Sequence, residues 1–280
     1  MSMGSLYVVA TPIGNLGDMS ARAIETLKNV DVILAEDTRH SAPLLRHFQI
    51  QTQCQAFHEH NEKEKAEVIC QRVLDGQNVA IISDAGVPLI SDPGFSLVRL
   101  AHEHGIPIVP IPGACAAITA ISASGLPTDR FNFEGFLPAK RGPKERALLA
   151  LANEQRTLIF YESPRRVVET LEIMRKIFGG ERQVVIAREL TKLFETIKKL
   201  PINDMLDFVS HDPNQVKGEI VLLVEGKPKQ DDDEQDEALK KLLTILLDDV
   251  PLKQAVALAM KITDAKRNKV YPLALAIKQN

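Results

Sequence analysis

Short apolar runs rich in Val and Ile recur along the chain, and stretches with a helical spacing of apolar residues separate them. Runs of this length are typical of buried strands, and their alternation with helices predicts an α/β fold in which helices cover a sheet. We expect strands at residues 6–10, 32–35, 79–83, 106–111, 157–161, 184–187 and 220–224, and helices at residues 20–29, 41–48, 63–75, 93–104, 114–124, 144–153, 164–178 and 203–209.

The spacing of the strands changes near the middle of the chain. In the first half strands alternate regularly with helices, whereas in the second half they lie closer together, with residues 131–136 and 196–199 expected as additional antiparallel strands. A chain of 280 residues is long enough for about two domains. We therefore predict two α/β domains, over residues 1–113 and 114–226.

A polar and strongly acidic stretch follows the last expected strand. Residues 227–237 have too few apolar side chains to bury a core, so we expect a solvated linker there. Residues 238–280 contain three short helical patterns with a basic last turn. This arrangement predicts a small, all-α, helix-turn-helix-like appendage.

Two of the expected helices carry start signals. Asp92 precedes Pro93, and Ser163 precedes Pro164. A polar N-cap followed by Pro at the first helical position is a frequent way to begin a helix. We therefore expect Asp92 and Ser163 to be N-caps.

Cysteine content and hydropathy indicate the compartment. The three cysteines are widely spaced and form no CxxC pair, which argues against a disulfide framework or a zinc knuckle. No apolar run approaches the roughly 18 residues of a membrane span, and the first residues lack the features of a secretory signal. These observations predict a cytoplasmic protein with reduced thiols and no membrane association.

The net charge of −3 conceals two segments of opposite sign. Residues 1–139 carry 9 Lys and Arg against 15 Asp and Glu, whereas residues 140–199 carry 14 against 8. Such segregation is expected of a protein that presents one basic face to a phosphate backbone, although solvated helix surfaces give the same totals. Aromatic residues make up only 5% of the chain, which disfavours a stacking platform for single strands.

Three loops rich in Gly and Pro follow expected strands, at residues 11–18, 83–94 and 110–117. None matches GxGxxG or GxxxxGK[ST], so the usual dinucleotide and ATP signatures are absent. Small residues let a ligand approach the backbone, and the carboxyl edge of a sheet is the usual ligand site of open α/β folds. The loops are therefore the predicted ligand site, although the first is also compatible with a plain turn.

Other polar residues allow other chemistries. His58 and His60 would share one face of a strand and could chelate a metal, but no second donor cluster accompanies them, so a loop at the substrate opening is the preferred interpretation. The sequence around Cys115 faintly resembles a nucleophile elbow, but no partner His–Asp pair is evident. We expect no metal.

Nine motifs occur in a fixed order along the chain: TPIGNLGD, AEDTRH, FHEHNE, SDAGVPLISDPG, PGACAAITA, SGLPTDRFNFEGFLPAKRG, IFYESPRR, ARELTKLFE and KGEIVLLVEG. Over residues 5–226 they resemble the 16S ribosomal RNA cytidine 2′-O-methyltransferases, which have the tetrapyrrole-methylase fold. The resemblance implies a two-domain α/β (class III) methyltransferase that holds S-adenosylmethionine between its domains. It also implies methylation of a cytidine ribose in the decoding region of 16S rRNA, within the small ribosomal subunit, by a homodimer.

The resemblance further implies site residues, carried over motif by motif. The residues expected to bind the cofactor are Pro12, Asp84, Gly86, Val87, Ile90, Gly113, Ala114, Tyr161, Ala187, Gly218 and Glu219.

Methyl transfer to a ribose hydroxyl requires placement of the hydroxyl in line with the methyl group and an acceptor for its proton. The candidates for that base are Glu36, Asp37, His60 and Glu195. The cations expected to hold phosphates are Arg39, Lys140, Arg141, Arg165, Arg188 and Lys192.

Three alternatives remain open. A methyltransferase of the same scaffold could act on a porphyrin-like tetrapyrrole, although dispersed basic residues fit such a ring less well. A cysteine hydrolase would depend on Cys115 and would be inactivated by thiol alkylation. A non-enzymatic ribosome-binding factor would use the basic loops and bind no cofactor.

Overall fold

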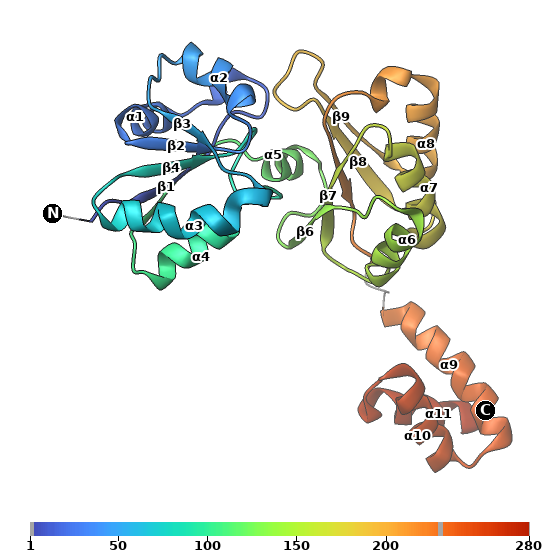
Figure 1. Ribbon diagram of the computed structural model, residues 1–280. Coiled ribbons are helices and arrows are strands. Elements are labelled where there is room, and N and C mark those ends of the chain that lie inside the picture. The colour runs from blue at the N-terminus through green and yellow to red at the C-terminus, as the bar shows by residue number, and fades with distance from the viewer. Residues whose placement is uncertain (1–2, 229–231, 280) are drawn as a thin grey trace. The chain divides into compact units, whose positions relative to one another are not determined.

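The computed structural model describes residues 3–228 and 232–279. Two compact units are present, Met1–Lys227 and Pro228–Asn280, and each has hydrophobic clusters of its own. The first unit contains two five-stranded sheets, and the second contains three helices (Figure 1).

The first sheet is entirely parallel. Its spatial order is β3 (Cys54–Ala56), β2 (Val32–Ala35), β4 (Val79–Ile82), β1 (Leu6–Val9) and β5 (Ile108–Ile111), and its helices are α1 (Ala21–Asn29), α2 (Thr38–His47), α3 (Glu59–Leu74) and α4 (Phe95–Glu103) (Figure 1). Successive side chains point to opposite faces, so Ile81 packs with α3 and α4 while Ile82 packs with α1 and α2. Both faces are buried, which explains why the strands are apolar throughout.

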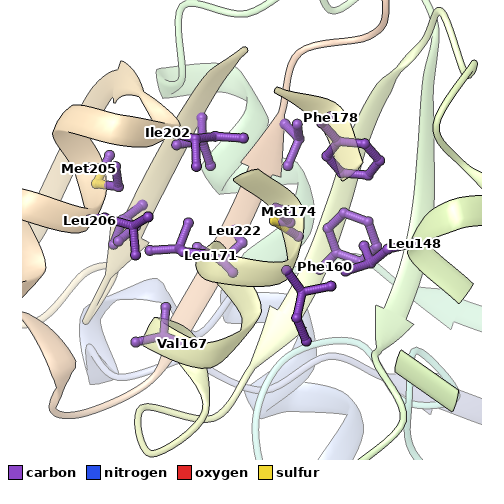
Figure 2. Close-up of a cluster of buried hydrophobic side chains, with 14 of the residues drawn as sticks. Leu148, Phe160, Val167, Leu171, Met174, Phe178, Ile202, Met205, Leu206 and Leu222 are labelled. Atoms are coloured by element: carbon purple, nitrogen blue, oxygen red, sulfur yellow. The ribbon is translucent and has the colours of Figure 1, made fainter. Parts of the chain in front are cut away.

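The second sheet is mixed. Its spatial order is β6 (Phe131–Phe136), β7 (Thr157–Glu162), β10 (Ile220–Val224), β8 (Gln183–Arg188) and β9 (Thr196–Pro201), and its helices are α5 (Ala116–Ala123), α6 (Arg141–Ala150), α7 (Val167–Phe178) and α8 (Ile202–His211). Strand β6 runs parallel to β7, and the other neighbours are antiparallel. Helix α5 packs on one face. On the other face, Phe160 and Leu222 of the strands meet Leu171 and Met174 of α7 (Figure 2).

Two 3-10 helices, η1 (Leu16–Asp18) and η2 (Pro213–Val216), lie in loops of the first unit. The second unit consists of α9 (Asp232–Asp249), α10 (Leu252–Thr263) and α11 (Arg267–Gln279). Its core includes Leu243, Ala259 and Val270, one from each helix. In the part of the chain that the structure describes, no helix is both long and apolar enough to span a membrane.

Several details differ from the sequence-based expectations. Residues 196–199 belong to an antiparallel strand as predicted, but the same prediction for residues 131–136 is wrong, because β6 pairs with β7 in parallel. Strand β3 was missed because it has only three residues, all half-buried. Helix α9 begins inside the expected acidic linker, at Asp232.

Both proline-cap predictions are wrong. Helix α4 begins at Phe95, and its N-cap is Gly94 with a φ of 123°. Helix α7 begins at Val167, with Arg166 as its N-cap. Asp92 and Ser163 therefore lie in the loops that follow β4 and β7, rather than at the first turn of a helix.

Leu222 and Leu243 are fully buried, one in each unit. Replacing either with Ala should cost about 2–5 kcal/mol of unfolding free energy, because it leaves a cavity in a packed core. We expect Leu243→Ala to accelerate amide hydrogen exchange in residues 237–279 and to leave β10 at the wild-type rate, with Leu222→Ala giving the reverse. Acceleration in both units by either variant would contradict the separate cores.

Candidate active site

The loops that follow β1 and β4 are joined by reciprocal backbone hydrogen bonds. The Thr11 amide donates to the Gly86 carbonyl at 2.9 Å, and the Gly86 amide donates to the Thr11 carbonyl at 3.1 Å. The Thr11 hydroxyl donates to the Ser83 carbonyl at 3.2 Å, and the Ser83 hydroxyl donates to the Gly86 carbonyl at 3.1 Å. These bonds fix the two loops against each other at the carboxyl edge of the parallel sheet.

The loop after β5 joins them at Gly86. This residue has a φ of +84°, and a Cβ there would lie 3.2 Å from Ile13 Cγ2 and 3.4 Å from the Ala114 carbonyl oxygen. Gly113 is confined in a similar way, because its Cβ would lie 2.8 Å from Ala10 Cβ. A glycine is therefore needed at both positions for the three loops to meet.

A cavity of about 360 Å³ is lined by residues that follow strands of both sheets. Its size is within the range of about 300–1,000 Å³ that is common for small-molecule sites. Of the predicted cofactor residues, Gly86, Val87, Ile90, Tyr161, Ala187, Gly218 and Glu219 line it, whereas Pro12, Asp84, Gly113 and Ala114 do not. Lining residues that sequence reasoning missed are Ile13, Ala85, Ser91, Asp92, Cys115, Ala116, Phe136, Glu162, Ser163, Pro164, Leu190, Ile220 and Val221. Most of them flank the predicted residues inside the same motifs. Their position next to those residues is the sequence signal that could have identified them.

The cavity wall contains strained backbone. Leu89 and Ser91 have φ angles of 72° and 70°, which side-chain-bearing residues rarely adopt. Such strain is concentrated at functional sites in proteins, where surrounding contacts hold it. One of these contacts is with β6, since a Cβ on Gly135 would lie 3.4 Å from the Ser91 hydroxyl oxygen.

Asp92 is a half-buried carboxyl group in the cavity wall. Burial raises its pKa to about 6, and the nearby charges of Glu36 and Asp84 add to the rise, against a hydrogen bond with Ser83 that lowers it. Asp84 also accepts a hydrogen bond from the Asp37 amide at 3.3 Å, which connects the loops after β2 and β4. The cavity therefore contains a carboxyl group that changes protonation near neutral pH.

Tyr161 belongs to β7 of the second sheet and also lines the cavity. Its hydroxyl oxygen accepts a hydrogen bond from the Ala117 amide at 3.3 Å, and its ring contacts Phe133 and Phe136 edge-on, with centroid distances of 4.9 and 5.6 Å. Burial and the neighbouring Cys115 raise the pKa of Tyr161 to about 12, so the phenol keeps its proton at neutral pH. The described residues that line the cavity include Cys115 but no histidine.

Lys192 connects the loop between β8 and β9 with the loop after β1. Its ammonium group pairs with Glu189 at 3.0 Å and with Glu219 at 3.1 Å. Its stem lies beside Gly14, where a Cβ would be 2.5 Å from Lys192 Cε. The charge of Lys192 is therefore committed to neighbouring carboxylates at the edge of the cavity.

Arg188 is buried despite its charge. Its guanidinium donates to the Phe194 carbonyl at 2.9 Å and to the Thr196 hydroxyl at 3.2 Å. Glu195 closes the same loop by accepting a hydrogen bond from the Thr191 amide at 2.6 Å. The predictions gave these residues the roles of phosphate ligand and base, whereas their contacts stabilise the loop between β8 and β9.

Of the remaining base candidates, Glu36 directly precedes the N-cap of α2, Asp37 is that N-cap, and His60 belongs to the first turn of α3. Asp37 is the N-cap of α2 and pairs with the Arg39 guanidinium at 2.9 Å. The side-chain hydrogen bond from Arg39 lowers the pKa of Asp37 to about 2, which makes this carboxylate a weak base. His58 is the N-cap of α3 and its amide donates to Asn61 Oδ1 at 2.9 Å, so residues 58 and 60 do not share a strand face. The side chain of His60 lies outside the described residues.

No group of three or more metal-ligating side chains occurs among the residues that the structure describes. The side chains of Lys140, Arg141 and Arg165 are exposed on the segments that leave β6 and β7. The same segments contribute Phe136 and residues 161–164 to the cavity wall. These three cations, called the cationic rim below, therefore lie within a few residues along the chain of residues that line the cavity.

Comparison with known proteins identifies the family and the fold of the chain. The family profile described as Tetrapyrrole (Corrin/Porphyrin) Methylases matches residues 5–206, and that described as RsmI C-terminal HTH domain matches residues 233–278. Solved structures with the same fold include a diphthine synthase (TM-score 0.62, 13% identity, 81% of this chain and 92% of that chain) and the methyltransferase CobJ (TM-score 0.60, 19% identity, 81% and 96%). These neighbours confirm the predicted fold class.

Much closer relatives are curated proteins named Ribosomal RNA small subunit methyltransferase I. The Pseudomonas aeruginosa protein is 54% identical over 277 residues, covering 98% of both chains. The Haemophilus influenzae protein is 52% identical, covering 98% of this chain and 97% of its own, and the Synechocystis protein is 43% identical, covering 98% and 99%. The chain therefore belongs to the tetrapyrrole methylase family, and within it to the family of the ribosomal RNA small subunit methyltransferase I proteins.

Proposed function

We propose that this enzyme transfers the methyl group of S-adenosylmethionine to the ribose 2′-hydroxyl of a cytidine in the decoding region of 16S rRNA, acting on the small ribosomal subunit. The observation that carries the proposal is a cavity with a titratable carboxyl group, whose lining segments continue along the chain into exposed cations. The names of the close relatives agree with an rRNA substrate. A homodimer and a cytoplasmic location stay predictions.

The cavity residues fit the proposed cofactor. Ile13, Leu190 and Val221 supply apolar surface for a nucleoside ring. Glu219 supplies a carboxyl group suited to an ammonium group or to ribose hydroxyls. When bound, S-adenosylmethionine supplies an already activated sulfonium methyl group, so the protein has to place the acceptor and exclude water.

A ribose hydroxyl is a poor nucleophile at neutral pH until its proton is removed. A base is most effective when its pKa lies near the working pH. Asp92, with a pKa of about 6, meets this condition, and Glu36 maintains it through the repulsion between the two carboxylates. We assign proton acceptance to Asp92, with Glu36 as its tuning neighbour.

The cations on the rim suit the phosphates of a structured RNA. Lys140, Arg141 and Arg165 are exposed, and Arg39 is exposed beside Asp37. Contacts with phosphates position an RNA without reading its bases, while contacts with the 2′-hydroxyl distinguish RNA from DNA. The charges of Lys192 and Arg188 are engaged within the fold.

The central test is methyl transfer from labelled S-adenosylmethionine to small ribosomal subunits from cells that lack this protein. We expect 2′-O-methylcytidine after digestion, and no product with a deoxycytidine substrate. Cofactor binding without transfer to RNA would leave the family assignment intact and would favour a tetrapyrrole or another acceptor. Absence of cofactor binding would favour the non-enzymatic factor.

Asp92→Asn should lower kcat by about 100-fold, because a general base is lost, while cofactor affinity changes by less than about threefold. Since the pKa of Asp92 in the folded protein lies above the ordinary value of 3.8, folding disfavours its charged form at pH above about 6. Asp92→Asn should therefore melt at a higher temperature than the wild type at pH 8 and at the same temperature below pH 4. An equal melting difference at both pH values would contradict the raised pKa.

Glu36→Gln is the matched variant for the same carboxyl pair. Removal of the neighbouring negative charge should lower the pKa of Asp92. The acidic limb of kcat against pH should then move to lower pH by roughly one unit, with the plateau above pH 7 retained. An unchanged limb would exclude Asp92 as the group that titrates.

Lys140→Ala and Arg165→Ala should each weaken binding of small subunits and reduce the slope of log affinity against log salt by about one, as expected for loss of one phosphate contact. Arg99→Ala is the control, because Arg99 is an exposed cation on α4 that pairs with Glu103 at 3.7 Å and does not line the cavity. An identical loss in all three variants would point to a general charge effect rather than to the rim.

A further inference from the structure

Lys144 is completely buried, although it belongs to the most basic stretch of the sequence. It lies in the first half of α6, and its ammonium group donates to Glu169 Oε2 at 2.8 Å and to the Thr170 hydroxyl at 3.1 Å. Burial of an ammonium group is costly unless its donors are satisfied. These two contacts on α7 supply the partners.

The chain of hydrogen bonds continues to the edge of the cavity. The Thr170 hydroxyl donates to Glu162 Oε2 at 2.6 Å. The buried Glu162 carboxylate also accepts from the Ser163 amide at 2.7 Å and pairs with Arg166 Nε at 3.2 Å. Glu162 is itself part of the cavity wall. A continuous polar path therefore leads from Lys144 to the cavity.

Arg166 carries the path back to the segment that leaves β6. Its Nη2 donates to the Leu137 carbonyl at 2.6 Å and to the Pro138 carbonyl at 3.1 Å. The segment after β6 is thus held at two points, through the carbonyls at residues 137 and 138 and through Lys144. The exposed cations Lys140 and Arg141 lie between these points.

We propose that Lys144, Thr170, Glu162 and Arg166 form a buried polar clamp that positions the cationic rim against the cavity, and that they are positioning residues for the RNA acceptor. A buried ion pair is weak support for stability, because apolar residues of similar volume often replace it without loss. A fixed network of directional bonds is instead suited to holding two loops in one geometry. The expected change in KM for small subunits rests on the proposed function.

Thr170 offers the sharpest test, because its hydroxyl connects the two halves of the clamp. Thr170→Val removes the hydroxyl at nearly constant volume, whereas Thr170→Ser keeps it. For Thr170→Val we expect faster amide exchange in residues 137–143 and a rise in KM for small subunits of about fivefold to tenfold, the size expected from one lost hydrogen bond. Cofactor affinity should stay within about twofold, and Thr170→Ser should behave as the wild type on both measurements.

Thr157→Val is the matched control. Thr157 is buried at the start of β7, the strand that ends at Glu162. Its hydroxyl donates to the Pro127 carbonyl at 2.7 Å, away from the clamp. It should change neither the exchange of residues 137–143 nor KM. Lys144→Met is a second variant, and it should reproduce the effect of Thr170→Val because Glu169 is partly exposed and remains solvated.

Two outcomes would overturn the clamp. One is exchange in residues 137–143 that is the same in Thr170→Val and the wild type. The other is an equal effect of Thr170→Val, Thr170→Ser and Thr157→Val, which would indicate general destabilisation. If the wild type fails to methylate small subunits, the proposed function fails, while the exchange measurement still decides whether the clamp exists.

Discussion

The pair of backbone hydrogen bonds between Thr11 and Gly86 is the constraint on which the rest of the site depends. It joins two loops that are 75 residues apart in sequence, and it does so with groups that every residue carries. Because Gly86 has a positive φ and no side chain, Ile13 and the Ala114 carbonyl can approach it. The loops that follow β1, β4 and β5 therefore meet closely at one edge of the cavity.

The electrostatics of the cavity follow from burial more than from ion pairs. Desolvation raises the pKa of both Asp92 and Tyr161, so the carboxyl group titrates near pH 6 and the phenol remains neutral. Asp37, which is exposed beside Arg39, has a lowered pKa instead. Carboxyl groups on the connected loops that follow β2 and β4 therefore have different chemistry, and their surroundings decide which of them can accept a proton at neutral pH.

Much of the fold could be predicted from the sequence, because short apolar runs mark the buried strands and a helical spacing of apolar residues marks the helices. The predictions that failed concern features that depend on tertiary contacts. The direction of β6 is set by its pairing with β7, and a local pattern holds no information about it. The Asp92–Pro93 pattern suits a helix cap and a cavity loop equally well, and the positive φ of Gly94 decides between them.

The same limit applies to the cations of the site. The basic stretch after residue 139 contains Lys140, which is exposed, and Lys144, which is fully buried. They are four positions apart in the sequence. Only the packing of α6 against α7 buries Lys144 while Lys140 stays exposed. Charge counting marks a basic region of the chain, but it could not separate the cations that face solvent from those that hold the fold together.

The order of strands in the second sheet has a consequence for synthesis of the chain. Strand β10 is the last strand of the sheet, yet it lies between β7 and β8 and pairs with both. At about 5–20 residues per second, a ribosome needs roughly two to seven seconds to make the residues between the end of β8 and the end of β10. During that interval β7 and β8 have apolar edges without a common partner. Because Ile220 and Val221 of β10 also belong to the cavity wall, the wall is complete only after β10 has joined the sheet.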